Sequence, residues 1–367
     1  LMGYLASIGG LGTQSFDAID KWLVRVPAGA GIATIFASAA FGATTGASIA
    51  TVMGLGPIVI PRMRELGYDD RVSISAVTSG GLLAIMIPPS IPLVVYGSIA
   101  NVSIPKLLLA AYIPGVITTI LFAATVMYLS TRVWKGSVDT STKFSLGKAL
   151  SSTKSSIGVI IAILVVFGGL YSGIMTATEI GALGVLTITS VSAPKIWKNR
   201  RQVPKALRDT VTTSCMVFIL LIAAELLSKF ITLSGVTFII DEWLRNSSVS
   251  PVVIIIIMLL VYVPLGMFLN SMSMFLVTLP LFIPIVRTLG FDPVWFGILA
   301  VVLAEVGMLT PPLGITVYAM NALLPDVPLT KIFRAVSPFL IAELVVLLIL
   351  IIFPQVTLWL PNMVYGN

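Results

Sequence analysis

Long apolar runs separated by short polar segments dominate the pattern along the chain. Residues 155–173, SSIGVIIAILVVFGGLYSG, form one such run, and a run of this kind can cross a hydrocarbon core about 30 Å thick. The pattern predicts an all-α polytopic membrane protein. The predicted uninterrupted spans cover residues 105–131, 155–172, 177–195, 205–230 and 329–354.

Two other apolar stretches, residues 28–64 and 251–287, are each too short to cross the membrane twice as full-length helices. Each has an apolar arm, a tip of small and polar residues, and a second apolar arm that returns. The tips read ATTGAS at residues 43–48 and FLNSMS at residues 268–273. The first arms have roughly sixteen residues, whereas a spanning helix needs about twenty. Because a polar tip at membrane depth must be buried in protein or face water, we expect re-entrant hairpins over residues 28–64 and 251–287.

Adjacent prolines interrupt an apolar run after each hairpin. The two sequences are IMIPPSIPLVVYG, which starts at Ile85, and MLTPPLGITVYAM, which starts at Met308. Proline has no backbone N–H and its ring clashes with the carbonyl four residues earlier, so a proline pair opens a helix. We therefore expect broken helices over residues 72–100 and 293–323. Since an unsatisfied backbone group in hydrocarbon costs several kcal/mol, such a break indicates a polar ligand at membrane depth.

A single shift of the numbering relates these features. Moving the chain by 223 residues, the separation of Pro88 from Pro311, superimposes prolines throughout both regions. The aligned pairs are Pro57 with Pro280, Pro61 with Pro284, Pro88 and Pro89 with Pro311 and Pro312, and Pro105 with Pro328. We infer an internal duplication. The first repeat covers residues 1–131, is incomplete at its N-terminus and has an amphipathic arm at 13–25; residues 132–154 form a linker; the second repeat covers residues 155–367, with its arm at 236–246.

Five predicted spans separate the two hairpins: the broken helix 72–100 and the spans 105–131, 155–172, 177–195 and 205–230. Because five is odd, the repeats should have opposite orientations in the membrane. Of the 22 Lys and Arg residues, all but Lys106, Lys229, Arg245 and Arg287 fall on one side, and the positive side faces the cytoplasm. We therefore expect a cytoplasmic linker, a first hairpin that opens from the cytoplasm, and a second hairpin and C-terminus on the periplasmic side. Inverted repeats with broken helices are typical of secondary transporters.

Composition narrows the chemistry. The chain is 57% hydrophobic and 10% charged, and its net charge of +7 follows the positive-inside distribution rather than indicating nucleic-acid binding. The absence of histidine excludes histidine proton relays, histidine metal ligands and Ser–His or Cys–His catalysis. No Walker-type phosphate loop is present. An intramembrane enzyme would need a dyad or a metal, and no close acidic pair at helical spacing is visible, so we expect no enzyme. A channel usually forms its pore by oligomeric symmetry, whereas an inverted pair in one chain favours alternating access.

Oxygen ligands gather at the hairpin tips. The first tip offers Thr44, Thr45, Gly46 and Ser48, and the second offers Asn270, Ser271 and Ser273. Hydroxyl and carbonyl oxygens without histidine suit Na⁺ better than a transition metal. A lone Ser or Thr in a membrane helix usually bonds its own backbone, but the repetition at one shift favours an ion site.

Carboxylates at membrane depth are few. Glu305 lies inside the second broken helix, where both a structural role and a role in the site are open. Glu225 and Glu343 face either a partner or another helix, and the sequence assigns neither to the site.

At these residues the chain resembles the large membrane subunit of tripartite ATP-independent periplasmic (TRAP) transporters. The resemblance covers nearly the whole chain and is carried by FGATTGASIATVMGLGPIVIPRMRELGYD, GGLLAIMIPPSIPLVVYG and AEVGMLTPPLGITVYAMNAL. It implies an inverted-repeat ion-transporter fold of the elevator type in the bacterial inner membrane, with Na⁺-driven uptake. It also implies a periplasmic binding protein that delivers a carboxylate, such as a C4-dicarboxylate or sialic acid, and a small four-helix membrane subunit. A self-sufficient Na⁺-coupled anion transporter of the same fold is the alternative.

The resemblance also implies ligands near the tips and breaks. One Na⁺ site would combine Thr44, Thr45, Gly46 and Ser48 with Ile87 and Pro88. A second would combine Asn270, Ser271 and Ser273 with Met308, Thr310 and Pro311. Substrate would lie near Ser48, Ser90, Ser271, Thr310 and Thr316. The first tip departs from the Ser-Gly-Ser-Ser that relatives often carry, and Asn270 stands where many have Asp.

Overall fold

The computed structural model describes residues 1–134, 145–172, 175–246 and 248–366. In these residues the secondary structure is entirely helical, which confirms the predicted all-α class. By length and composition, six of the described helical stretches are apolar and long enough to cross a membrane. They are Asp70–Ala100, Ile104–Val133, Arg200–Leu233, Pro251–Phe268, Ser271–Thr288 and Leu329–Ile352.

The chain divides into two compact units, and each is described by itself. Unit 1 consists of Leu1–Ser90, Gly115–Thr210 and Thr316–Ala342, and unit 2 of Ile91–Pro114, Val211–Ile315 and Glu343–Asn367. The chain therefore passes from one unit to the other shortly after each proline pair. Three long helices, α8 (Ile104–Tyr128), α13 (Val203–Leu233) and α19 (Leu329–Ile352), each contribute residues to both units.

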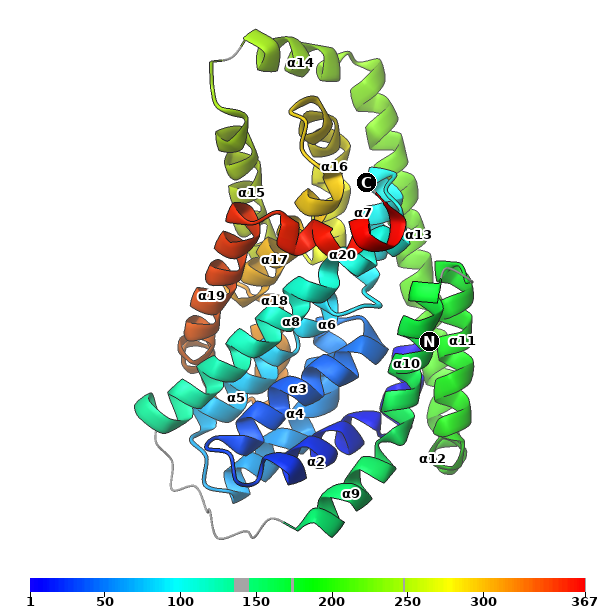
Figure 1. Cartoon of the computed structure of the whole chain (residues 1–367), viewed down its shortest axis with the longest axis vertical. Helices are drawn as coiled ribbons and strands as arrows, with labels where there is room; N and C mark the ends of the chain where they lie inside the picture. The colour runs from blue at the N-terminus through cyan, green and yellow to red at the C-terminus, as the bar shows by residue number, and fades with distance from the viewer. Residues whose placement is uncertain (135–144, 173–174, 247, 367) are drawn as a thin grey trace. The chain divides into compact units, whose positions relative to one another are not determined.

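Unit 1 is built around the first predicted hairpin (Figure 1). The hairpin consists of α3 (Gly29–Thr45) and α4 (Ser48–Glu65). Besides these and its parts of the three long helices, unit 1 contains α1 (Met2–Ile8), α2 (Leu11–Leu23), α5 (Asp70–Gly80), α6 (Leu83–Met86), α9 (Leu146–Ser155), α10 (Ile157–Ser172), α11 (Ala177–Val191), α12 (Ala193–Lys198) and all but the first residue of α18 (Ile315–Leu323), with a π-helical turn at Leu129–Val133 and a 3₁₀ turn at Arg200–Gln202.

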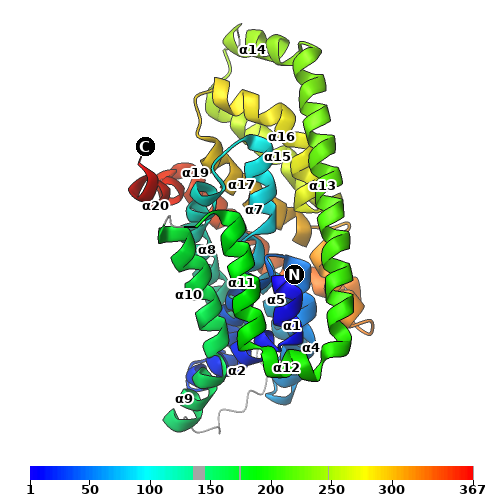
Figure 2. The same cartoon turned by 90° about the vertical axis from the view of Figure 1, so that its right-hand side faces the viewer.

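Helix α3 is the centre of unit 1. It is buried along almost its whole length and contacts α2, α4, α5 and α6. Phe41 of α3 and Leu55 of α4 are fully buried, and both lie against Gly12 of α2, where a Cβ would come within 3.2 Å of Leu55. Helices α10 and α11 contact each other and lie side by side in both views (Figures 1 and 2). The all-round apolar character of α3 thus follows from its position among neighbours.

Unit 2 is built around the second predicted hairpin. Its helices are α7 (Ile91–Ala100), α14 (Val236–Asn246), α15 (Pro251–Phe268), α16 (Ser271–Thr288), α17 (Pro293–Leu309) and α20 (Gln355–Tyr365). Helix α17 is buried from Val294 to Leu309 and packs against α15, α16, α7 and α20.

Aromatic side chains fill the interior of unit 2. The rings of Tyr96 and Phe275 meet edge to face at 5.6 Å, and those of Tyr262 and Phe282 at 5.7 Å. Such geometry is favourable because the positive ring edge faces the negative ring surface. Buried hydroxyls need partners: Tyr96 donates to the Pro293 carbonyl at 2.6 Å, and Tyr262 accepts from Thr278 at 3.0 Å.

Helix α19 ends just before a proline, and a side chain of α17 donates a hydrogen bond to one of its last carbonyls. The carbonyl of Leu350 would ordinarily accept from residue 354, but Pro354 has no N–H. The indole Nε1 of Trp295 donates to that carbonyl instead, at 2.9 Å. This hydrogen bond fixes the start of α17 against the end of α19.

The shift of 223 residues relates local geometry in the two units. Helix α4 maps onto α16 residue for residue. Each ends in a turn with a left-handed glycine, Gly67 (φ 79°) or Gly290 (φ 78°), a conformation that favours glycine. An aspartate then caps the next helix: Asp69 accepts from the Arg71 N–H at 2.8 Å, and Asp292 accepts from the Val294 N–H at 2.7 Å.

Several element bounds differ from those predicted. Helix α9 occupies part of the predicted linker 132–154, and residues 135–144 of that linker lie outside the described part of the chain. The predicted span 177–195 is divided, because α11 ends at Val191 and α12 begins at Ala193, where Pro194 occupies the first helical turn. Helix α5 begins earlier than expected because Asp69 supplies a cap that the apolar pattern does not reveal.

Candidate functional site

The first tip is a tight turn between α3 and α4. Gly46 ends α3 in the left-handed conformation (φ 65°), and its N–H donates to the Gly42 carbonyl at 2.8 Å. Ala47 is extended (φ −145°, ψ 128°), and α4 begins at Ser48. The last carbonyls of α3 and the first N–H groups of α4 therefore meet at this turn, without partners within their own helices.

The threonine hydroxyls of the first tip bond groups of α3 and α4. Thr44 Oγ1 donates to the Phe41 carbonyl at 2.7 Å, and the hydroxyl oxygens of Thr45 and Thr51 lie 2.8 Å apart. A hydroxyl that donates to a carbonyl keeps lone pairs for a cation. Thr44, Gly46 and Ser48 are buried and Thr45 is half-buried. The geometry is thus compatible with ion ligation and with the ordinary structural role.

The first tip lies against the first broken helix. A Cβ on Gly42 would come within 2.7 Å of the Ala84 Cα, so the end of α3 touches the backbone of α6. A Cβ on Gly81 would come within 3.1 Å of the Ser48 carbonyl oxygen. Unit 1 therefore packs the hairpin against the part of the broken helix that precedes the break.

The break itself follows α6. Ile87 is extended (φ −86°, ψ 120°), the peptide bond between Pro88 and Pro89 is cis, and α7 begins at Ile91. Pro88 and Ser90 are buried, and Ile87 is half-buried. Helical hydrogen bonding is thus interrupted three residues after Ala84, which touches the end of α3.

The second tip has a different turn. Leu269 and Asn270 are extended, and the Asn270 carboxamide oxygen accepts from the Ser273 N–H at 2.9 Å, so Asn270 is the N-cap of α16. Asn270 is exposed, Ser271 is buried and Ser273 is half-buried. The predicted ligand Asn270 has a local structural role that the sequence pattern did not indicate.

The second break lies at the end of α17. Thr310 is extended (φ −91°, ψ 136°), its hydroxyl donates to the Val306 carbonyl at 2.6 Å, and the bond between Pro311 and Pro312 is cis. Met308 is buried and Pro311 is exposed. A Cβ on Gly307 would come within 2.5 Å of the Gly266 Cα, so α15 and α17 are in backbone contact beside this break.

The two predicted Na⁺ sites thus fall in different units, the first in unit 1 and the second in unit 2. The predicted substrate residues divide between them. Ser48, Ser90 and Thr316 belong to unit 1, and Ser271 and Thr310 belong to unit 2. Thr316 is fully buried.

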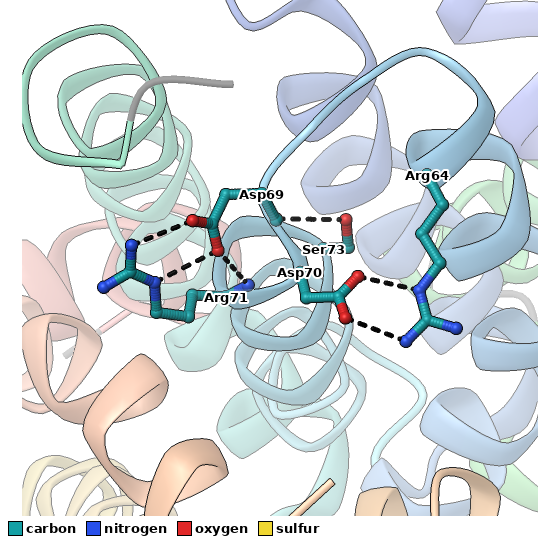
Figure 3. Close-up of polar contacts among 5 residues, drawn as sticks. All are labelled: Arg64, Asp69, Asp70, Arg71 and Ser73. Atoms are coloured by element: carbon teal, nitrogen blue, oxygen red, sulfur yellow. Dashed lines mark hydrogen bonds and ion pairs between the residues drawn. The ribbon is translucent and has the colours of Figure 1, made fainter. Parts of the chain in front are cut away.

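Charged side chains gather at the turn from α4 to α5 (Figure 3). Arg64 donates to both carboxylate oxygens of Asp70, at 2.7 and 3.0 Å, and Arg71 donates to those of Asp69, at 3.1 and 2.8 Å. The hydrogen bond that Asp69 accepts from Arg71 lowers the pKa of Asp69, and the hydrogen bonds that Arg64 donates to Asp70 raise the pKa of Arg64. The Ser73 hydroxyl donates to the Asp69 carbonyl. These pairs fix the turn that joins the hairpin to the broken helix.

A cavity of about 610 Å³ in unit 1 lies away from the tip. Its polar lining includes Asp20, Arg25, Arg62 and Tyr68, and burial raises the pKa of Asp20, opposed by Arg62. No predicted site residue lines it. This cavity is therefore separate from the predicted ion sites.

Sequence reasoning missed two buried hydroxyls in unit 1 and the pairing of two glutamates in unit 2. In unit 1 the hydroxyls of Ser38 and Ser79 have no hydrogen-bond partner in the described structure, and Ser38 lies beside Gly80. In unit 2 the structure brings Glu305 of α17 and Glu343 of α19 together, both fully buried. Neither set has a sequence signature, since the two glutamates come from separate helices.

A family model and curated relatives all match this chain to the same class of transporter subunit. A family model described as "Tripartite ATP-independent periplasmic transporter, DctM component" matches residues 1–356. The "C4-dicarboxylate TRAP transporter large permease protein DctM" of Pseudomonas aeruginosa is 30% identical, and the match covers 99% of this chain and 84% of that protein. The "Sialic acid TRAP transporter large permease protein SiaM" of Vibrio cholerae is 27% identical, covering 100% and 85%.

Two further similarities extend the comparison. The "Isethionate TRAP transporter permease protein DctMQ" of Oleidesulfovibrio alaskensis is 30% identical over 97% of this chain but only 56% of its own length. Among solved structures, the YdaH transporter of Alcanivorax borkumensis aligns with a TM-score of 0.63 at 14% identity, covering 98% of this chain and 86% of that one. The second similarity concerns the fold alone.

Proposed function

Because the chain belongs to the family of the DctM component of tripartite ATP-independent periplasmic transporters, we propose that it imports a small carboxylate together with Na⁺, by elevator-type alternating access. As a TRAP large permease with several apolar helices, it is a multi-pass inner-membrane protein. In the proposal the C-terminus is periplasmic, and the two repeats enter the membrane from opposite sides.

One observation supports the proposal: in both units the hairpin arm that precedes the tip contacts the helix that precedes the break, at positions that match to within one residue of the 223-residue shift. The end of α3 touches α6 at Gly42 and Ala84, and the end of α15 touches α17 at Gly266 and Gly307. Ala84 and Gly307 are 223 residues apart. In each unit the end of a helix and an interrupted helix therefore meet at backbone distance, an arrangement that offers carbonyl oxygens and helix termini to an ion.

The choice of Na⁺ rests on the donors. The tip residues offer neutral hydroxyl, carboxamide and backbone oxygens, and the chain has no histidine. Such hard, uncharged oxygens favour a hard monovalent cation over a transition metal. In this proposal Thr44, Thr45, Gly46 and Ser48 serve one site, and Asn270, Ser271 and Ser273 serve the other.

Substrate and partners follow from the relatives. The names of the matched proteins mention C4-dicarboxylate, sialic acid, isethionate and ectoine. Three of these four kinds of compound carry a carboxylate and isethionate carries a sulfonate, so we propose a small carboxylate, bound near Ser48, Ser90, Ser271, Thr310 and Thr316. A periplasmic binding protein would deliver it, and a small four-helix membrane subunit would accompany this chain.

Uptake into proteoliposomes tests the proposal. The purified complex is given a panel of labelled carboxylates under an inward Na⁺ gradient, with K⁺ as the control, and with or without the cognate binding protein. We expect uptake that needs both Na⁺ and the binding protein. Equal uptake in K⁺ would contradict Na⁺ coupling, and Na⁺-driven uptake without a binding protein would support the self-sufficient transporter instead.

Hydroxyl variants locate the ion sites. Ser48→Ala and Thr310→Ala should each raise the Na⁺ concentration needed for half-maximal uptake, whereas Thr310→Ser should behave as the wild type. Thr125→Ala is a matched control, because its hydroxyl also donates to a carbonyl four residues earlier, at 2.8 Å, but lies outside the tips. If Ser48→Ala and Thr310→Ala both leave Na⁺ activation unchanged, these hydroxyls are not ligands.

A further inference from the structure

Two glutamates face each other inside unit 2. Glu305 lies in α17 and Glu343 in α19, and neither has any exposed surface. They are the fully buried carboxyl groups among the described residues. A hydrogen bond from Trp295 of α17 to the Leu350 carbonyl of α19 holds these two helices together, and the two carboxyl groups lie close enough to interact. Yet none of their four oxygens accepts a hydrogen bond from an N–H or O–H group of the described structure.

The helices that pack against α17 supply no partner for this pair. Tyr96 of α7 donates to the Pro293 carbonyl, and Tyr262 of α15 accepts from Thr278. Arg287 of α16 donates to the Ala100 carbonyl, and Tyr365 of α20 is exposed. No described Lys or Arg forms an ion pair with either glutamate. The facing group of each carboxyl is therefore the other carboxyl.

In this arrangement the two carboxyl groups cannot both be ionised. Two negative charges at contact distance in a fully buried position, without a basic partner among the described residues, repel each other. Something positive must lie between them. A hard divalent cation takes about six oxygen ligands, more than two carboxyl groups provide. A proton needs only two facing oxygens, one to carry it and one to accept the hydrogen bond.

We propose that Glu305 and Glu343 form a proton-binding site, in which the carboxyl O–H of one residue donates to a carboxyl oxygen of the other. One proton gives the pair a single negative charge. A second proton, taken from water, makes the pair neutral and allows two reciprocal O–H to oxygen hydrogen bonds. The ligand is thus the proton, and the site is distinct from the neutral oxygens of the tips.

Infrared spectroscopy of the purified full-length protein tests this directly. At pH 8, exposed carboxyl groups are ionised, so a C=O stretching band of protonated carboxylic acid reports a buried proton. We expect this band in the wild type and its loss in the double variant Glu305→Gln with Glu343→Gln. Each single Gln variant should keep a weaker band, because an amide can pair with one protonated carboxyl.

Glu225→Gln is the matched control. Glu225 lies in the part of α13 that belongs to unit 2, but it is exposed and forms an ion pair with Lys229 at 3.5 Å. Its replacement should leave the band unchanged. Because glutamine has nearly the shape of glutamic acid, we expect the variants to fold, and the single variants preserve the test if the double variant does not.

Three results would overturn the proposal. A wild type without the band at pH 8 would mean that no proton is held. A double variant with an unchanged band would place the proton elsewhere. A band that is present in KCl but absent in NaCl would identify Na⁺ as the occupant. Equal bands in the two salts support the proton, and this readout does not depend on whether transport is coupled to Na⁺.

Discussion

A methyl group added at Gly307 tests whether the hairpin arm α15 and the broken helix α17 must touch. The Cβ of Gly307→Ala would lie 2.5 Å from the Gly266 Cα and 2.6 Å from its carbonyl carbon. Ordinary contacts of this kind are 3.4–4 Å. Both obstructing atoms belong to the backbone, so no side chain can turn aside, and α15 must move away from α17 by about 1 Å.

The energetic cost follows from this displacement. Overpacking of a close contact costs about 1–3 kcal/mol. Alanine also favours the helix over glycine by about 0.5–1 kcal/mol, which offsets part of the cost. Gly168→Ala in α10 is the matched control, because a Cβ there meets nothing within 4 Å. Since both variants gain the same helix propensity, their difference isolates the overpacking cost of about 1–3 kcal/mol.

Thermal unfolding in detergent measures this difference, and Na⁺-dependent uptake measures its functional consequence. We expect Gly307→Ala to unfold at a lower temperature than Gly168→Ala and to need more Na⁺ for half-maximal uptake. If the two variants have equal unfolding temperatures and equal Na⁺ dependence, the contact at Gly307 is not constrained and the reasoning is refuted.

Two further variants probe individual hydrogen bonds. Asp69→Ala removes the N-cap of α5 and should cost about 1 kcal/mol at pH 7, whereas Asp69→Asn should keep the cap. Because Arg71 lowers the pKa of Asp69, the carboxylate stabilises the fold above its ordinary pKa near 4 and loses this effect as pH falls through the lowered value; a deficit of Asp69→Ala that does not shrink in acid would contradict this. Trp295→Phe leaves the Leu350 carbonyl without its donor and should cost about 1–3 kcal/mol, while Trp359→Phe, at an exposed position, should be neutral in thermal unfolding.

Much of the fold could be predicted because the sequence carries local signals for it. Apolar runs indicated the helices, and proline pairs indicated where two of them are interrupted. Small and polar residues marked the tips, so Gly46 and Asn270 lie at turns between helices. These features depend on residues close together in the chain, which a single sequence can reveal.

Contacts between distant residues could not be predicted. Glu305 and Glu343 belong to separate helices, and nothing in either helix indicates that their side chains meet. The cap at Asp69 and the division of residues 177–195 at Ser192 depend on single polar residues within or beside apolar runs. The sequence also does not reveal that the hydroxyls of Thr44 at the tip and Thr310 at the break already donate to backbone carbonyls.

The most direct test of the account is simultaneous measurement of labelled Na⁺ and labelled carboxylate entering proteoliposomes that contain the complete complex. The account predicts that Na⁺ enters with substrate in a fixed ratio of at least one, and that removing either solute from the outside stops entry of the other. Substrate entry at the full rate without accompanying Na⁺ would contradict it.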